Sequence, residues 1–211
     1  MKHFFSADIA AWEQRYRSTF INSLSGFKAL CLVGSVNKNH VYNVAPFNSL
    51  VHLGAHQPLM GLVFRPDSTE RHTLDNIRSN GVYTINLVHR QISAQAHQCS
   101  ARYPKQVSEF SATGLNPEFL FDCKAPFVKE SKIKWAMQLE TEMEIAANRT
   151  LFVIGRVLQV HVMEACVQAD GYVNLQMAET LTVNGLDAYH TCNLPLRYNY
   201  AKPDRELKPL S

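Results

Sequence analysis

The chain has 211 residues, of which 46% are hydrophobic and 18% are charged, and its formal net charge is +3. This length fits one domain with a sizeable core, and the composition excludes an intrinsically disordered chain. The Lys and Arg residues are scattered and form no basic run interleaved with aromatic residues, which argues against a nucleic-acid-binding protein.

The five cysteines include no CxxC pair and are odd in number, so neither a closed disulfide framework nor a zinc ribbon is expected. Scattered thiols of this kind are typical of a reducing cytoplasm. The N-terminal residues MKHFFSADIAAWEQRYR lack the apolar segment of a signal peptide, and no run approaches the roughly 20 apolar residues needed to cross a bilayer. We therefore expect a soluble, cytoplasmic protein with no membrane partner.

Hydrophobic periodicity and turn residues predict the elements of the first half of the chain. Ser6 or Asp8 would cap the first helix, Pro46 would end or bend the second strand, and Gly81 would cap a later helix. In chain order these elements are a helix at about 7–17, strands at 27–36, 41–49 and 59–64, a helix from about 73 to 80, and a strand at 82–88, with a loop at 50–57.

The second half contains the clearest predicted hairpin. Residues 133–147 alternate between apolar and polar, which places Trp135, Met143 and Ile145 on one face and Lys134 on the other, so that one face is turned to water or to a partner. The elements expected here are a helix at 91–101, an irregular excursion at 102–132, strands at 133–147 and 151–162, a helix at 175–181, and an extended tail at 197–211. Six or more strands with a few short helices predict one mainly β domain (1–211), with a barrel over about 27–190.

Several common kinds of active site are excluded. No two glycines lie closer than seven positions, so neither a GxGxxG nor a P-loop motif occurs, and GxSxG is absent too. His52 and His56 are four apart, but their surroundings indicate a loop rather than a metal site. Cys99 lies near His97 without the rest of a triad. We therefore predict no catalytic side chain and no metal ligand.

The stretch Val41–Arg78 is the remaining candidate site. A polar loop between apolar strands, followed by arginines and hydroxyls at a helix start, is suited to binding a phosphate. The side chains of Asn43, Asn48 and Ser49 can hydrogen-bond the polar edge of a heterocycle. The side chains that could surround a phosphate are Arg65, Ser68, Thr69, Arg71 and Thr73. On composition alone, a generic polar loop is an equally good interpretation.

These motifs also resemble a known family. The order NxAPxxS (residues 43–49), FRP (64–66) and RHTLxNI (71–77), followed by AHQCSARYPKQVSEF (96–110), is similar to the flavin reductase-like, FMN-binding proteins, including the larger flavoredoxin-type members. The resemblance extends over about residues 27–189.

The resemblance implies a split β-barrel of Greek-key type that binds FMN, as a homodimer with the flavin near the subunit interface. Residues 101–103 would close over the flavin from the same or the other subunit. Many relatives have a serine where this chain has Asn48, so the contact is expected from Asn48 or Ser49. By position, the flavin ring and ribityl chain would contact Asn43, Ala45, Pro46, Phe47, Asn48 and Ser49, and the phosphate would contact Arg65, Ser68, Thr69, Arg71 and Thr73.

The function that the resemblance implies is an FMN-dependent reductase. NADH or NADPH is the candidate electron donor, and a small molecule or a protein is the acceptor. Because the flavin carries the redox chemistry, no acid or base from the protein is required. Two alternatives stay open: a flavoredoxin-type electron carrier without a nicotinamide site, and a non-catalytic barrel that binds another ligand.

Overall fold

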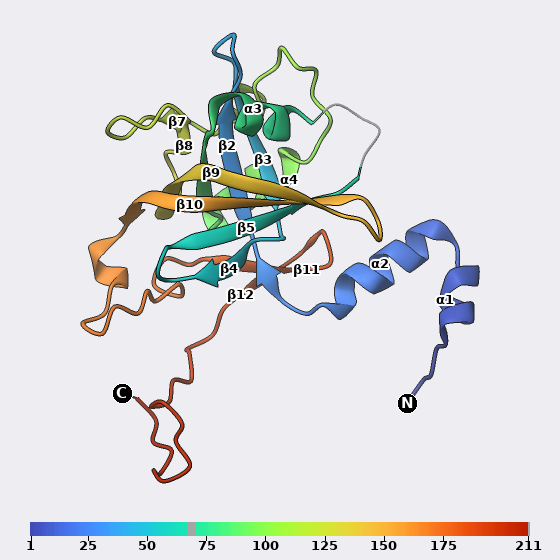
Figure 1. Cartoon of the computed structure of the whole chain (residues 1–211), viewed down its shortest axis with the longest axis vertical. Coiled ribbons are helices and arrows are strands. Elements are labelled where there is room, and N and C mark those ends of the chain that lie inside the picture. The colour runs from blue at the N-terminus through green and yellow to red at the C-terminus, as the bar shows by residue number, and fades with distance from the viewer. Residues whose placement is uncertain (67–70, 211) are drawn as a thin grey trace.

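The structure is a computed structural model that describes residues 1–66 and 71–210. At its centre lies a seven-stranded antiparallel sheet in the order β3-β2-β6-β9-β10-β5-β4 (Figure 1). Its strands are β2 (Cys31–Val36), β3 (Tyr42–Phe47), β4 (Val51–Gly54), β5 (Leu59–Phe64), β6 (Val82–Leu87), β9 (Ile133–Ile145) and β10 (Thr150–Val162).

Smaller elements surround this sheet. A three-stranded sheet contains β1 (Lys28–Ala29), β11 (Leu181–Asn184) and β12 (Ala188–Thr191), and a short ribbon pairs β7 (Pro117–Glu118) with β8 (Phe127–Val128). The helices are α1 (Ser6–Ala11), α2 (Gln14–Leu24), α3 (His72–Asn80), α4 (Ser93–Gln98) and α5 (Glu109–Thr113), with 3₁₀ turns at Arg90–Ile92 and Glu164–Cys166. Within the described ranges, no helix has the length and apolarity to cross a membrane.

The large sheet curls around one core. Its edge strands β3 and β4 are consecutive in the chain. The connection between them is bonded to β5, because the Ser49 hydroxyl donates to the carbonyl of Val63 at 3.0 Å and accepts from the N–H of Val63 at 3.1 Å. The ring of Phe47 on β3 packs 4.9 Å from that of Phe64 on β5. Strands β2, β5, β6, β9 and β10 all contribute buried side chains to this core.

A second core lies on the other face of β2 and β3. Leu32 and Val44 pack there against Ala96 of α4 and Phe110 of α5. Burial of these apolar groups fixes both helices on the sheet, and it therefore places the connection between them, residues 99–108, beside β3.

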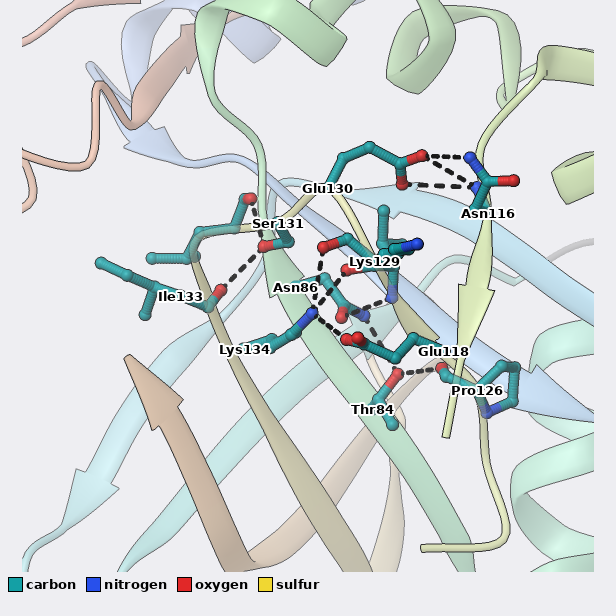
Figure 2. A network of polar contacts seen from close by, with 12 residues as sticks. Thr84, Asn86, Asn116, Glu118, Pro126, Lys129, Glu130, Ser131, Ile133 and Lys134 are labelled. Atoms are coloured by element: carbon teal, nitrogen blue, oxygen red, sulfur yellow. Dashed lines mark hydrogen bonds and ion pairs between the residues drawn. The ribbon is translucent and has the colours of Figure 1, made fainter. Parts of the chain in front are cut away.

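A buried polar network holds the predicted excursion against the sheet (Figure 2). Lys134, predicted to lie on a face turned to water or to a partner, is instead 7% exposed and is covered by the chain itself. Its ammonium group donates to Glu118 Oε2 at 2.5 Å and to the carbonyl oxygens of Val128 and Lys129 at 3.1 and 3.2 Å. The predicted alternation holds from Ile133 to Leu139, but residues 114–131 of the chain itself cover the Lys134 side of the strand.

A β-bulge reverses the facing of the second half of β9. Gly155 is opposite Leu139 whereas Ile154 is opposite Thr141, so Glu140 is the extra residue. Met143 therefore lies opposite Phe152 on the outer side of the sheet, and it is 54% exposed. The alternation of residues 133–147 predicts Met143 and Ile145 on the same face as Trp135, and this prediction is wrong because a bulge shifts the alternation by one residue.

Three other predicted elements need correction. The helix expected at about 7–17 is two helices, because the Glu13 carboxylate caps α2 by accepting from the N–H groups of Arg15 and Tyr16. The expected loop at 50–57 contains the edge strand β4. The helix expected at 175–181 is a series of turns that leads into β11. In contrast, the bounds of β5 and the Gly81 cap of α3, with φ of 71°, were predicted correctly.

Candidate functional site

Two adjoining cavities lie where β3, the end of β5 and the start of α3 meet. The main cavity, of about 850 Å³, is bounded by these elements and by the 99–105 loop. The side cavity, of about 600 Å³, lies between the β3–β4 connection and the β11–β12 hairpin. The two share one wall, made by Pro46, Phe47, Phe64, Arg65, Arg71 and Ser100.

Every predicted site residue that the structure describes lines one of these cavities. Ser68 and Thr69 lie outside the described residues. The main cavity is lined by Asn43, Ala45, Pro46, Phe47, Arg65, Arg71 and Thr73, and the side cavity by Pro46, Phe47, Asn48, Ser49, Arg65 and Arg71. The structure thus brings the two halves of the predicted stretch together, because β3 and α3 lie side by side.

Asn48 and Ser49 already have partners in the protein. The Asn48 amide donates to the carbonyl of Gly185 at 3.0 Å, which joins the β3–β4 connection to the β11–β12 hairpin. The Ser49 hydroxyl is engaged by Val63 of β5. Both side chains therefore shape the side cavity as well as line it.

Asn43, Thr73 and Glu109 form a buried polar group in the wall of the main cavity. Each is at most 7% exposed. With its amide nitrogen turned toward the carboxylate, Asn43 donates to Glu109 Oε1 at 3.3 Å and accepts from Thr73 Oγ1 at 3.0 Å. The other carboxylate oxygen of Glu109 accepts from the N–H of Val44 at 3.2 Å. This group fixes the Asn43 side chain on the cavity wall.

Burial raises the pKa of the Glu109 carboxyl above its ordinary value of 4.5, although backbone N–H donors and nearby His72 act in the opposite direction. Sequence reasoning missed Glu109 as a site residue. It falls within the stretch 96–110 that carried the family resemblance, but nothing local indicates that it reaches β3, 65 positions earlier in the chain.

The charge of the main cavity is mainly positive. Its described lining includes four side chains that carry full positive charge, Arg65, Arg71, Arg102 and Lys105, against the single carboxylate of Glu109. The Arg65 guanidinium also donates to Asn22 Oδ1 of α2 at 3.2 Å. The lining also includes an apolar part, with Phe47, Phe64 and Leu74. A flat apolar group bearing an anionic substituent is the class of ligand that such a lining suits.

The side cavity adds residues that sequence reasoning did not identify. The Nδ1 atom of His97 lies 2.6 Å from the hydroxyl of Tyr189, and both residues line this cavity together with Asp187 and Leu186. Leu186, Asp187 and Tyr189 were missed because the β11–β12 hairpin was not predicted, and His97 was considered only as a partner of Cys99. Burial raises the pKa of the Tyr189 phenol, and the nearby Asp187 carboxylate adds to the shift.

Cys99 lines the main cavity but is not an activated nucleophile. It is 4% exposed, its sulfur lies 3.5 Å from Thr113 Oγ1, and burial raises the pKa of its thiol to about 11. His97 bonds Tyr189 rather than Cys99. Over residues 1–66 and 71–210, no three His, Cys, Asp or Glu side chains gather closely enough to hold a metal ion.

Comparison with known proteins identifies the family. The family model described as flavin reductase like domain matches residues 27–179. A crystal structure from Shewanella frigidimarina, of a protein assigned as a flavin reductase with a split barrel domain, is 47% identical. The match covers 95% of this chain and 100% of the Shewanella chain, with a TM-score of 0.92.

More distant structures share the fold. Nitrilotriacetate monooxygenase component B from Bacillus cereus is 19% identical with a TM-score of 0.82, covering 93% of this chain and 100% of its own. Flavoredoxin from Desulfovibrio vulgaris is 21% identical with a TM-score of 0.70, and the match covers 84% of this chain and 91% of the flavoredoxin chain.

Together the fold and its cavities define a mainly β protein of the split-barrel type, as predicted. The chain belongs to the flavin reductase-like family, and its general function is flavin-related oxidoreduction.

Proposed function

We propose that this protein binds FMN in the main cavity and acts as a reductase that takes electrons from NADH or NADPH. The observation that carries the proposal is the pairing of Arg65 and Arg71 with the apolar wall of Phe47 and Phe64 in one cavity. Two cations can hold a phosphate, while the apolar wall and the amide of Asn43 accept a flat heterocycle. The printed names of two structural neighbours, a flavoredoxin and an FMN-binding protein, support the choice of cofactor.

The residues of this chain would divide the work of binding. Arg65, Arg71 and Thr73 would hold the phosphate, and β3 from Asn43 to Phe47 would line the ring and ribityl chain. FMN, when bound, supplies the hydride and electron chemistry. The protein contributes orientation, through the fixed Asn43 amide, and exclusion of water, through the 99–105 loop. No acid or base from the protein is needed for this function.

The side cavity favours a reductase over a simple electron carrier. It shares a wall with the main cavity, so a second reactant there would lie beside whatever occupies the main cavity. An electron carrier that receives electrons from a protein partner does not need such a space.

The first experiment is an absorbance spectrum of the purified protein, followed by anaerobic titration with NADH and NADPH. We expect a yellow protein, or a colourless one that gains thermal stability from FMN, and bleaching by at least one nicotinamide. A colourless protein with no response to FMN would contradict the proposal. A yellow protein that only a reduced protein partner can bleach would identify an electron carrier instead.

A further inference from the structure

The 99–105 loop carries two positive charges that the described protein does not neutralise. Arg102 and Lys105 are exposed, and both line the main cavity. Within the described part of the chain, neither side chain has a hydrogen bond or an ion pair. Away from the cavities such charges are commonly paired, as Arg78 is with Glu142 at 2.9 Å. Two unpaired cations beside a cavity indicate a place where an anionic ligand can bind.

The loop that carries these charges is anchored in the protein. Cys99, its first residue, is buried in the second core. The side-chain amide of Gln98 donates to the hydroxyl of Tyr103 at 3.0 Å, and Tyr103 is half-buried. Pro104 restricts the backbone at its own position and at the residue before it. The backbone that carries the two cations is therefore held beside the cavity.

One phosphate does not use up the positive charge of the main cavity. A phosphate monoester carries about −1.5 to −2 at neutral pH, and the proposed function assigns the phosphate of FMN to Arg65 and Arg71. Glu109 is the one carboxylate in the described lining, and it is engaged by groups of β3. Arg102 and Lys105 therefore remain for a second anion.

The chemistry of the loop favours a terminal phosphate as this anion. The N–H groups of Ser100, Ala101 and Tyr103 all donate to carbonyl groups of the same segment. The loop thus offers cationic side chains rather than the row of free N–H groups that commonly binds a diphosphate. A terminal phosphate has up to two charges and three free oxygens, which suit a guanidinium and an ammonium together.

We propose that Arg102 and Lys105 bind the 2′-phosphate of NADPH and make the protein prefer NADPH to NADH, an inference that rests on the proposed function. The two nucleotides differ only in that phosphate. Ser100 lines both cavities, so the loop borders the space in which a second reactant would lie. The side cavity itself contains Asp187, whose carboxylate would repel a phosphate. The loop is the better place for it.

The first test is the binding of NADP⁺ and of NAD⁺ to the FMN-loaded protein by isothermal titration calorimetry, which requires no turnover. We expect the wild type to bind NADP⁺ about tenfold more tightly or better. Arg102→Ala/Lys105→Ala is expected to weaken NADP⁺ binding about 10- to 150-fold and NAD⁺ binding less than about threefold. The advantage of NADP⁺ in the wild type should shrink as salt is added.

The matched control is Lys124→Ala/Arg205→Ala. This variant loses the same two positive charges, from exposed side chains that line neither cavity. We expect it to keep the advantage of NADP⁺, and the ratio of kcat/KM for NADPH and NADH should follow the same order across the three proteins. Circular dichroism would verify that both variants fold, which we expect because all four side chains are exposed.

Equal affinity of the wild type for NADP⁺ and NAD⁺ would overturn the proposal, and so would an advantage that Arg102→Ala/Lys105→Ala retains. Equal loss of both nucleotides would overturn it too, because the two cations would then bind the diphosphate. A loss of FMN affinity as large as that of NADP⁺ would assign them to the flavin phosphate instead. Failure of the proposed function is seen separately, since a protein that binds no FMN shows this in its absorbance spectrum before any nucleotide is added.

Discussion

The carboxylate of Glu109 lies 3.2 Å from the backbone nitrogen of Val44, and this contact joins α5 to the strand that walls the main cavity. The neighbouring Asn43 amide faces the other oxygen of the same carboxylate. One side chain from the 96–110 stretch therefore holds two groups of β3 in place, at the point where we expect the flavin ring to bind.

Glu109→Ala is expected to lower the free energy of unfolding by about 1–3 kcal/mol, because the buried Asn43 amide would lose the carboxylate it donates to and the N–H of Val44 would lose one of its two acceptors. Glu109→Gln keeps an acceptor oxygen, so it is expected to lower the free energy of unfolding less than Glu109→Ala does. Urea unfolding measures both. FMN affinity should fall in the alanine variant, since Asn43 is no longer fixed. Equal stability of the two variants would show that the hydrogen bond is unimportant.

Glu109 is also expected to make the stability of the protein depend on pH. Burial raises the pKa of Glu109 in the folded protein above its ordinary value of 4.5. The folded state therefore holds this proton more tightly than the unfolded state, and the stability it contributes is lost as pH rises through the folded-state pKa.

Glu109→Gln does not titrate, so it should gain stability relative to the wild type as pH rises. Unfolding curves for both proteins from about pH 4 to about pH 8 would measure the difference. A difference that is constant with pH would show that the folded-state pKa is not raised.

Arg65→Ala is expected to raise the dissociation constant for FMN by about 10- to 150-fold, because a hydrogen bond to a charged group contributes roughly 1.5–3 kcal/mol. Riboflavin, which lacks the phosphate, should bind the variant and the wild type alike. The control is Arg149→Ala, since the Arg149 side chain is 80% exposed at the β9–β10 turn and lines neither cavity. An equal loss for riboflavin would show that Arg65 does not contact the phosphate.

Thr73→Ala tests the other end of the proposed phosphate site. Its hydroxyl bonds Asn43, so the alanine variant should weaken FMN through both the phosphate and the ring, whereas Thr73→Ser should bind normally. Fluorescence quenching of FMN measures both. Unchanged affinity in Thr73→Ala and Arg65→Ala together would mean that the phosphate lies elsewhere.

Local patterns predicted the elements whose determinants are local. The run Leu59–Phe64 is apolar and bounded by proline, and Gly81 supplies the left-handed residue that ends α3, so both were read correctly. The candidate stretch could be proposed from sequence because its arginines, hydroxyls and amides are close together and resemble a family motif. Its described residues line the two cavities, and its role in binding FMN stays a prediction.

Features that depend on distant segments were missed. The burial of Lys134 requires residues 114–131 to fold over the sheet, and the outward turn of Met143 requires a bulge that alternation does not reveal. Glu109 reaches the cavity only because α5 packs on β3. In each case the deciding partner lies far along the chain, where no periodicity can indicate it.

Cys99 is expected to react slowly with iodoacetamide at neutral pH. Burial raises its thiol pKa to about 11 from an ordinary value of 9.0, which lowers the reactive thiolate about a hundredfold. Its low exposure slows the reaction further. Cys192, which is half-buried, is the comparison site within the same protein. Mass spectrometry of the alkylated peptides gives both rates, and faster labelling of Cys99 would contradict the buried assignment.

Two neighbouring lysines make glutamate contacts of the same length but differ in burial and in their further hydrogen bonds. Lys134 and Lys132 each place their ammonium 2.5 Å from a glutamate, Glu118 and Glu179 respectively, but the side chain of Lys134 is 9% exposed and that of Lys132 is 24% exposed. Lys134 also donates to two carbonyls of the 114–131 segment (Figure 2).

Lys134→Met is therefore expected to lower the free energy of unfolding by about 1–3 kcal/mol, because the carbonyls and the carboxylate lose their shared donor. Lys132→Met should change it far less, since an exposed ion pair is weakened by solvent. Hydrogen exchange should show faster opening of residues 114–131 in Lys134→Met alone. Equal effects of the two substitutions on stability and exchange would mean that the network in Figure 2 does not hold this segment on the sheet.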